Sequence, residues 1–167
     1  MYQRILVPLD DGAISDRALD EAIRLARLTG GQLCLFHVLD DLSMAVSADT
    51  AVIGYVGELI GRQRARARRM LNRGLARATA AGVAAQTVLR EDFSSPVDAR
   101  VIGQAEVWKA DLIVIGTHGR RGLARLMLGS SAERILRLSP VPVLLVRGLA
   151  SSAQAAEATA ASTATHD

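Results

Sequence analysis

The sequence contains one cysteine, Cys34, and one lysine, Lys109, and aromatic residues make up only 3% of its 167 positions. One cysteine cannot form an intrachain disulfide, and it argues against a metal site built from thiolates. With so few aromatic rings, the core must be built from Val, Leu, Ile and Ala. Apolar residues make up 50% of the chain, which is enough for the core of one domain.

Long apolar runs are also missing, and none approaches the length that spans a bilayer. The start of the chain does not resemble a secretory signal, because only five apolar residues follow Arg4 before Asp10. The formal net charge of +3 is too small to argue for binding to nucleic acid or to a membrane. We therefore expect a soluble, cytoplasmic domain.

Short apolar segments alternate with helical patterns along the chain. Strands are predicted over Tyr2–Leu9, Gln32–Val38, Ala84–Leu89, Asp111–Ile115 and Val141–Val146. Helices are predicted over Ser15–Thr29, over Tyr55–Ala81, from Ser94-Ser95-Pro96 to about Trp108, and over Ser131–Leu138, with a surface loop over 40–54. The helix after Ser95 is expected to have a serine N-cap and Pro96 in its first turn. This alternation predicts an α/β fold, with helices on both faces of a parallel sheet.

The last twenty residues differ from the rest in composition. Residues 148–167 are rich in Ala, Ser and Thr and have almost no large apolar side chain. Such a segment cannot bury enough surface to offset the entropy lost on ordering. We assign residues 1–147 to the domain and predict a disordered tail over 148–167.

Arginines recur along one side of the helix predicted over Tyr55–Ala81. They are Arg62, Arg66, Arg69, Arg73 and Arg77. Apolar residues lie on the opposite side, where they can pack on a sheet. The arginine stripe is either a surface for anions or nucleic acid or a solvated helix face, and we favour the solvated face.

The segment Gly116–Glu133 (GTHGRRGLARLMLGSSAE) directly follows the fourth predicted strand. Gly116, Gly119, Gly129 and Ser130 have the spacing glycine, two residues, glycine, nine residues, glycine, serine. Glycine lets a phosphate approach backbone N–H groups closely. Ser130 and Ser131 open the next helix, whose free N–H groups and positive dipole end favour an anion. The segment can therefore close over a polyphosphate from both ends.

The same residues also fit a purely structural role. Gly116 and Gly119 can serve a tight turn, and Ser130 with Glu133 matches the capping box S-x-x-E. A capping serine uses its side chain on its own helix, although its backbone N–H stays available. The spacing by itself leaves both interpretations open.

Several motifs together resemble the universal stress protein family over about residues 1–147. They are ILVPLD near the start, HVLD after the second predicted strand, DLIVIGTHGRRGL and GSSAERILRLSPVPVLLVR. The glycine pattern is similar to G-x2-G-x9-G-[S/T] of the family's ATP-binding subgroup. The resemblance implies an open, Rossmann-like sheet (adenine nucleotide alpha hydrolase-like) of five parallel strands in the order 3-2-1-4-5, and usually a homodimer.

The resemblance also implies roles for individual residues. Asp10 would contact the ribose or the phosphate–metal region, where Mg²⁺ would be held through the phosphates, and Val38 would lie beside adenine. The residues implied around the phosphates are Gly116, Gly119, Gly129, Ser130 and Ser131. In a sheet of this order, ligands bind outside the carboxyl ends of the strands where the winding reverses. Asp10 ends the first predicted strand and Gly116 ends the fourth, so both arguments select the same crevice.

The chain departs from many family members at Asp11-Gly12, where Gly-Ser usually follows the aspartate. Adjacent carboxylates at Asp10 and Asp11 would repel a polyphosphate unless Mg²⁺ bridges them. We therefore expect ATP affinity to depend on Mg²⁺.

The fifth predicted strand supplies the argument for a partner. In the order 3-2-1-4-5 it lies at the sheet edge, and its sequence, VPVLLV, carries no charge before Arg147. An uncovered edge of this kind pairs readily with another chain. Pro142 removes one donor, so the ladder must begin after it. We expect a homodimer through the strand 141–147.

No nucleophile with a partner base is evident, and no residue is recognisable as positioning an acceptor for phosphoryl transfer. We therefore expect a protein that is not a dedicated enzyme, with weak ATP hydrolysis at most. The leading hypothesis is an ATP-binding stress-response protein, a nucleotide-dependent regulatory or protective module whose loop Arg120–Leu128 is presented to an unknown protein partner. The alternatives are a slow ATPase or nucleotidyl transferase, and a dimeric scaffold that binds no nucleotide.

Overall fold

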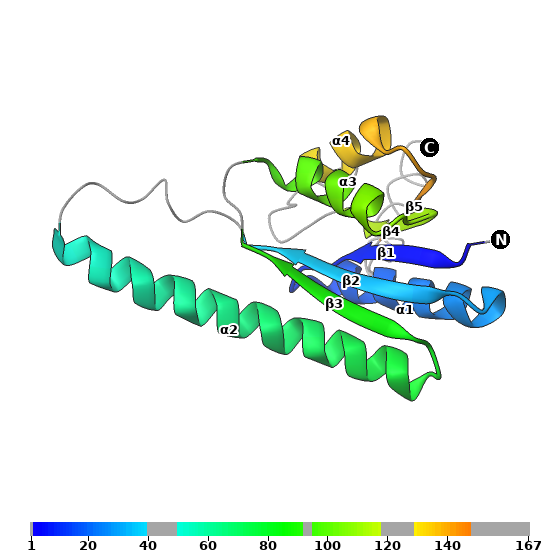
Figure 1. Cartoon of the computed structure of the whole chain (residues 1–167), viewed down its shortest axis with the longest axis horizontal. Coiled ribbons are helices and arrows are strands. Elements are labelled where there is room, and N and C mark those ends of the chain that lie inside the picture. Colours follow the sequence, from blue (N-terminus) through cyan, green and yellow to red (C-terminus); the bar gives the residue numbers. More distant parts are fainter. Residues whose placement is uncertain (1, 40–49, 92–94, 118–128, 148–167) are drawn as a thin grey trace, which may run out of the picture.

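A computed structural model describes residues 2–39, 50–91, 95–117 and 129–147, with the backbone alone for 50–56 (Figure 1). The strands are β1 (Arg4–Pro8), β2 (Gln32–Val38), β3 (Ala85–Arg90), β4 (Leu112–Gly116) and β5 (Val143–Val146). The helices are α1 (Ala13–Thr29), α2 (Thr50–Ala80), α3 (Val97–Val107) and α4 (Ser130–Leu138). The tail predicted over 148–167 lies outside the described residues.

The strands form one parallel sheet in the order β3-β2-β1-β4-β5. This order confirms the predicted fold class. The winding reverses between β1 and β4, which pair through Ile5 with Leu112 and Leu6 with Ile113. The carboxyl ends of these two strands therefore lie side by side, where a sheet of this kind binds its ligands.

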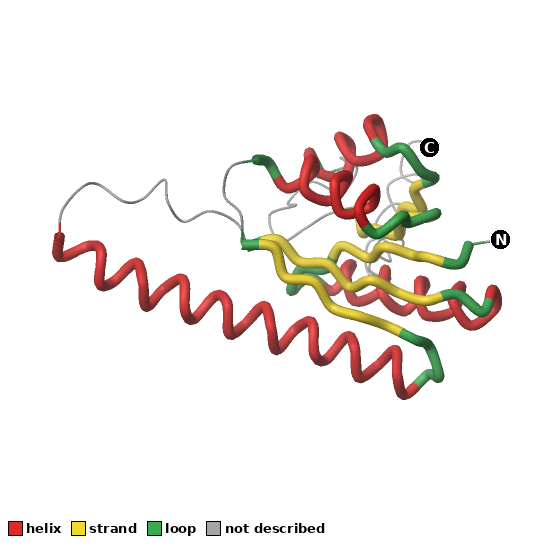
Figure 2. The backbone as a smooth tube through the Cα atoms, in the orientation of Figure 1, coloured by secondary structure: helices red, strands yellow, loops and turns green. Residues whose placement is uncertain are grey.

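Helices cover both faces of the sheet, as Figure 2 shows. Side chains alternate along each strand, so Ile5 and Val7 pack with α1 and α2 while Leu6 packs with α3 and α4. β2 divides in the same way, with Leu35 in the first cluster and Phe36 in the second. Two cores, one on each face, therefore fix the sheet that positions the site.

Cys34 lies in the second of these cores and is fully buried. Burial raises the pKa of its thiol, and a hydrogen bond from Gln86 opposes that shift. The thiol is therefore protonated at neutral pH and behaves as a small apolar group. Within the described residues, no helix combines the length and the apolar composition needed to cross a bilayer.

Helix α2 is longer than the sequence pattern predicts. It begins at Thr50 rather than at Tyr55, so the surface loop predicted over 40–54 is wrong for 50–54, and 40–49 lie outside the described residues. Gly57 and Gly61 lie within the helix with open space around them, and one such glycine costs only about 1 kcal/mol relative to alanine. The N-terminal part of α2 extends past the ends of β2 and β3 (Figure 1).

Helix α3 begins one residue later than predicted and without a serine cap. Its N-cap is Pro96, with φ −65° and ψ 157°, and no side chain caps the helix. Pro96 itself is extended, so the first helical residue is Val97 and Ser95 lies outside the helix. The Ser95 hydroxyl instead accepts a hydrogen bond from Arg100 Nε at 3.4 Å.

Candidate functional site

The turn between β1 and α1 is closed by the side chain of Asp10. Its Oδ1 accepts a hydrogen bond from the backbone N–H of Gly12 at 2.8 Å. A Cβ atom on residue 12 would lie 2.8 Å from the same oxygen, so a larger residue here would displace the Asp10 carboxylate. The backbone N–H of Asp10 donates to the buried hydroxyl of Ser15 at 2.9 Å. Asp10 is therefore fixed at the carboxyl end of β1, directly before helix α1.

His37 holds the same turn from the side of β2. Its Nδ1 donates a hydrogen bond to the Leu9 carbonyl oxygen at 2.6 Å, because a carbonyl can only accept. This contact fixes the His37 ring at the end of β2. Val38 follows it and is 7% exposed, so its side chain belongs to the core rather than to an open cleft.

The end of β4 meets the beginning of α4. The Gly129 N–H donates to the Thr117 carbonyl oxygen at 2.9 Å. Thr117 itself follows β4 and donates its N–H to Val146 of β5 at 2.9 Å. The two ends of the glycine-rich segment are thus joined by a hydrogen bond. The segment between them, with Gly119 and the loop Arg120–Leu128, lies outside the described residues.

Helix α4 begins with Gly129 as its N-cap, at φ −58° and ψ 141°, and no side chain caps it. The capping box that was one of the two alternatives for Ser130 and Glu133 does not form, because Ser130 lies inside the first turn. Glu133 bonds to the Gly129 carbonyl oxygen through its backbone N–H at 2.9 Å. The Gly129 N–H is taken by Thr117, so it is not available to a phosphate. The N–H groups of Ser130 and Ser131, one residue further along, have no acceptor within the helix. They are the donors that this helix end offers to an anion.

Gly116 is required for packing, which the glycine spacing alone does not reveal. A Cβ atom at this position would lie 2.8 Å from Ile14 Cγ2 and 3.3 Å from the Ile14 carbonyl carbon. Its φ is not positive, so conformational freedom is not the reason for glycine here. Gly116 instead allows the end of β4 to approach the first turn of α1, close to Asp10.

We expect Gly116→Ala to lower the free energy of unfolding by about 1–3 kcal/mol, because the new methyl group overlaps Ile14. Urea denaturation measures this change. Gly103→Ala is the matched control, since a Cβ atom there meets nothing within 4 Å and alanine favours the helix interior. Equal stability of Gly116→Ala and the unaltered protein would contradict the packing role.

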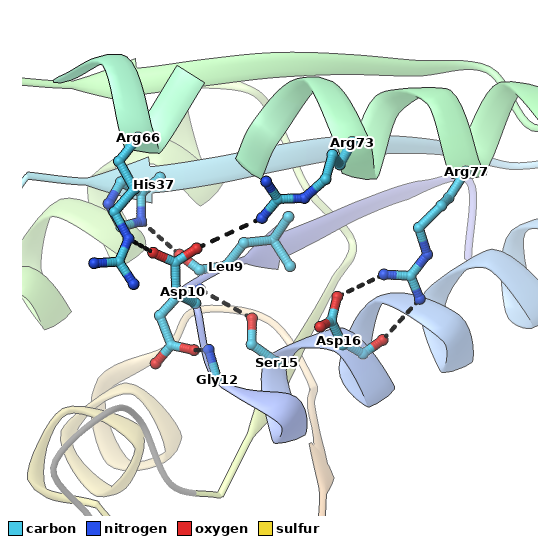
Figure 3. Close-up of polar contacts among 10 residues, drawn as sticks. Leu9, Asp10, Gly12, Ser15, Asp16, His37, Arg66, Arg73 and Arg77 are labelled. Atoms are coloured by element: carbon cyan, nitrogen blue, oxygen red, sulfur yellow. Dashed lines mark hydrogen bonds and ion pairs between the residues drawn. The ribbon is translucent and has the colours of Figure 1, made fainter. Parts of the chain in front are cut away.

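Asp11 faces helix α2 and is paired with two arginines. Arg66 Nε donates to Asp11 Oδ2, and Arg73 Nη2 lies 3.8 Å from Asp11 Oδ1. The Asp11 side chain is 16% exposed, against 59% for Arg66 and 69% for Arg73. Figure 3 shows both arginines reaching from α2 towards the turn that carries Asp10. The two carboxylates of this turn are therefore not equivalent, and Asp11 is already neutralised.

Other charged contacts continue along the same helix. Arg77 bonds to Asp16 at 2.6 Å and to Asp20 at 2.5 Å, both on α1. Arg64 forms a bidentate pair with Glu91 at 2.8 and 2.6 Å. These hydrogen bonds hold the pKa of the Glu91 carboxyl below its usual range. The interpretation of the arginine stripe as a solvated face is thus incomplete, because three of its members pair with the β1–α1 region.

A pocket of about 260 Å³ lies beside Asp10, between α1 and α2. Its lining residues are Leu9, Asp10, Ser15, Asp16, Met70, Arg73, Gly74 and Arg77. Among the predicted site residues that the structure describes, Asp10 alone contributes to it. The glycine and serine residues at the ends of β4 and α4 lie elsewhere on the carboxyl edge, so the pocket does not coincide with the predicted phosphate site.

The described residues contain no group of three or more His, Cys, Asp or Glu side chains arranged to hold a metal ion. Mg²⁺ accepts one or two carboxylates together with phosphate oxygens and waters. Asp10 can supply one such carboxylate, because no cation pairs with it in the described part of the chain. The donor set therefore fits a metal held mainly by a phosphate ligand.

A protein-family model, curated sequences and solved structures are similar to most of this chain. A family model described as "Universal stress protein family" matches residues 1–147. "Universal stress protein YxiE" of Bacillus subtilis is 28% identical over 151 residues, covering 88% of this chain and all of that protein. A universal stress protein family structure from Burkholderia pseudomallei is 33% identical, with a TM-score of 0.67, and the match covers 87% of this chain and 96% of that one.

Two similar structures contain nucleotides. A universal stress protein in complex with cAMP is 27% identical, with a TM-score of 0.60, and the match covers 87% of this chain and 97% of that one. One from Archaeoglobus fulgidus in complex with dAMP is 21% identical, with a TM-score of 0.61, over 87% of this chain and 98% of that one. The second likeness concerns the fold alone.

Proposed function

Because the chain belongs to the universal stress protein family, we propose that it binds ATP at the carboxyl edge between β1 and β4. There it would act as a nucleotide-dependent regulatory or protective module. The hydrogen bond from Gly129 to Thr117 carries this proposal, since it brings the start of α4 to the end of β4. The cAMP complex of a similar protein supports an adenine nucleotide as the ligand class.

In this proposal each predicted residue has a place. The N–H groups of Ser130 and Ser131 bind phosphate oxygens, with the dipole of α4 adding to the attraction. Gly129 and Gly119 keep the approach free of side chains, while Gly116 keeps β4 close to α1. Asp10 would hold the ribose or a Mg²⁺ ion bound with the phosphates, and Val38, whose side chain is buried in the core, would lie beside the adenine and present its backbone.

Two measurements test nucleotide binding directly. We expect the purified protein to carry an adenine nucleotide, which chromatography of the released ligand would identify. We also expect ATP to bind more weakly in EDTA than with Mg²⁺, because Asp10 and the phosphates repel each other without a cation. Titration calorimetry would measure both affinities. Equal affinities would remove Mg²⁺ from the proposal, and absence of ATP binding would favour a scaffold that binds no nucleotide.

We further propose a homodimer through β5. This strand is the last in the sheet order and pairs with β4 on one side only among the described residues. All four of its residues are only half-buried, and apolar edges of this kind pair with another strand. Sedimentation equilibrium at micromolar concentration should therefore give twice the mass of the chain. A monomer under these conditions would contradict the proposal.

A further inference from the structure

The turn after β1 carries two adjacent carboxylates, and arginines of helix α2 compensate the charge of one of them. Asp10 and Asp11 place two negative charges at the end of β1, next to the proposed phosphate site. The Asp11 side chain is only 16% exposed, so water alone screens it poorly. Arg66 and Arg73 supply two positive charges within ion-pairing distance of it.

The spacing of the two arginines explains how one helix supplies both. Arg66 and Arg73 are seven residues apart, which is two helical turns, so they lie on the same side of α2. Arg69 lies between them on this stripe, but no ion pair forms at Arg69 within the described structure. The contact with Asp11 therefore distinguishes two members of the stripe from a neighbour with the same charge.

We propose that Arg66 and Arg73 are positioning residues for the nucleotide site. They neutralise Asp11 and hold the turn from Asp10 to Gly12, so that Asp10 is left as the one unpaired carboxylate facing a polyphosphate. This inference rests on the proposed ATP binding. It adds residues of α2, outside the glycine motif, that influence the affinity for the nucleotide. It also explains how the sequence Asp-Asp-Gly is compatible with an anionic ligand.

A series of ligands with increasing charge tests the proposal. Calorimetry with adenosine, AMP and ATP would be carried out on the unaltered protein and on Arg66→Ala, with Arg69→Ala as the control that loses the same charge. We expect Arg66→Ala to weaken ATP binding about tenfold and AMP binding about threefold, with adenosine unchanged. The reason is that the Asp11 carboxylate, without Arg66 as its partner, repels each ligand according to the ligand's charge. Arg69→Ala should leave all three affinities within about twofold, because Arg69 forms no ion pair with a carboxylate among the described residues.

Removing the carboxylate should reverse the effect. Asp11→Asn in the Arg66→Ala background is expected to restore ATP affinity, and Asp11→Asn alone should bind ATP at least as tightly as the unaltered protein. The single variant keeps the test decisive even where Arg66→Ala fails to fold. Equal losses for all three ligands, or no recovery with Asp11→Asn, would reduce Arg66 to a structural role and overturn the inference. Failure of the unaltered protein to bind any of the three would instead overturn the proposed function.

Discussion

Gly129→Val is expected to abolish ATP binding, raising the Kd by about a hundredfold or more. The valine side chain would stand at the N-cap of α4, where phosphate oxygens must approach the N–H groups of Ser130 and Ser131. Losing even one set of charge-assisted hydrogen bonds of this kind costs several kcal/mol, and each 1.4 kcal/mol is tenfold in affinity. Titration calorimetry with ATP would measure the loss.

The backbone at this position allows the test to separate binding from folding. Gly129 has φ −58° and ψ 141°, a conformation that valine adopts without strain. Valine is a poorer N-cap than glycine, so a stability loss of about 1 kcal/mol is expected, and a thermal melt would measure it. Gly103→Val is the matched control, since its Cβ region is open, and it should leave ATP affinity unchanged. A folded Gly129→Val protein that retains its ATP affinity would contradict a phosphate site here.

The positions of the strands and helices could largely be predicted from the sequence, because the local hydrophobic and turn patterns match the elements of the observed sheet. The bounds of β2, Gln32–Val38, are those predicted, since the strand is preceded by Gly30, a left-handed helix cap at φ 67°. Alternation of strands and helices indicates a parallel sheet but not the order of its strands. The order 3-2-1-4-5 came from the family resemblance, because strand neighbours are set by long-range packing that no local pattern encodes.

Helix boundaries were less predictable, because capping depends on the geometry of the chain as well as on residue type. The pair Ser130 and Glu133 satisfies a capping pattern, yet the hydrogen bond from Gly129 to Thr117 sets the N-cap one residue earlier. Similarly, Ser95 followed by Pro96 is a favourable start for a helix, but Pro96 itself has an extended ψ of 157° and is the N-cap.

The partners of the arginine stripe could not be predicted at all. Helical periodicity shows which side of α2 is polar, but it does not show what that side faces. Arg66 and Asp11 are 55 positions apart in sequence, and they meet only because α1 and α2 pack on the same face of the sheet. The same holds for Gly116, whose contact with Ile14 depends on β4 lying beside β1. Sequence spacing could suggest these residues as candidates, but only the tertiary arrangement distinguishes a packing glycine from a ligand-binding one.

Arg134→Ala is expected to lower the free energy of unfolding by about 2 kcal/mol, because it leaves a buried carboxylate unpaired. Asp98, in the first turn of α3, has a side chain that is only 6% exposed, and its Oδ2 accepts a hydrogen bond from Arg134 Nε at 2.8 Å. Arg134 is 58% exposed, so water can reach the pair and the loss falls below that of a fully buried ion pair. Urea denaturation would measure the change.

Arg137→Ala on the same helix is the control for the loss of one arginine. Arg137 lies 4.0 Å from Glu133, and both side chains are more than half exposed, so its removal should cost less than about 0.5 kcal/mol. Asp98→Asn in the Arg134→Ala background should recover most of the lost stability, because the buried charge is then absent. Similar losses for Arg134→Ala and Arg137→Ala would show that Asp98 tolerates burial without its partner. In that case the apolar packing of Ile135 in the core shared with α3, rather than the ion pair between α3 and α4, would have to account for the docking of the helix that presents Ser130 and Ser131.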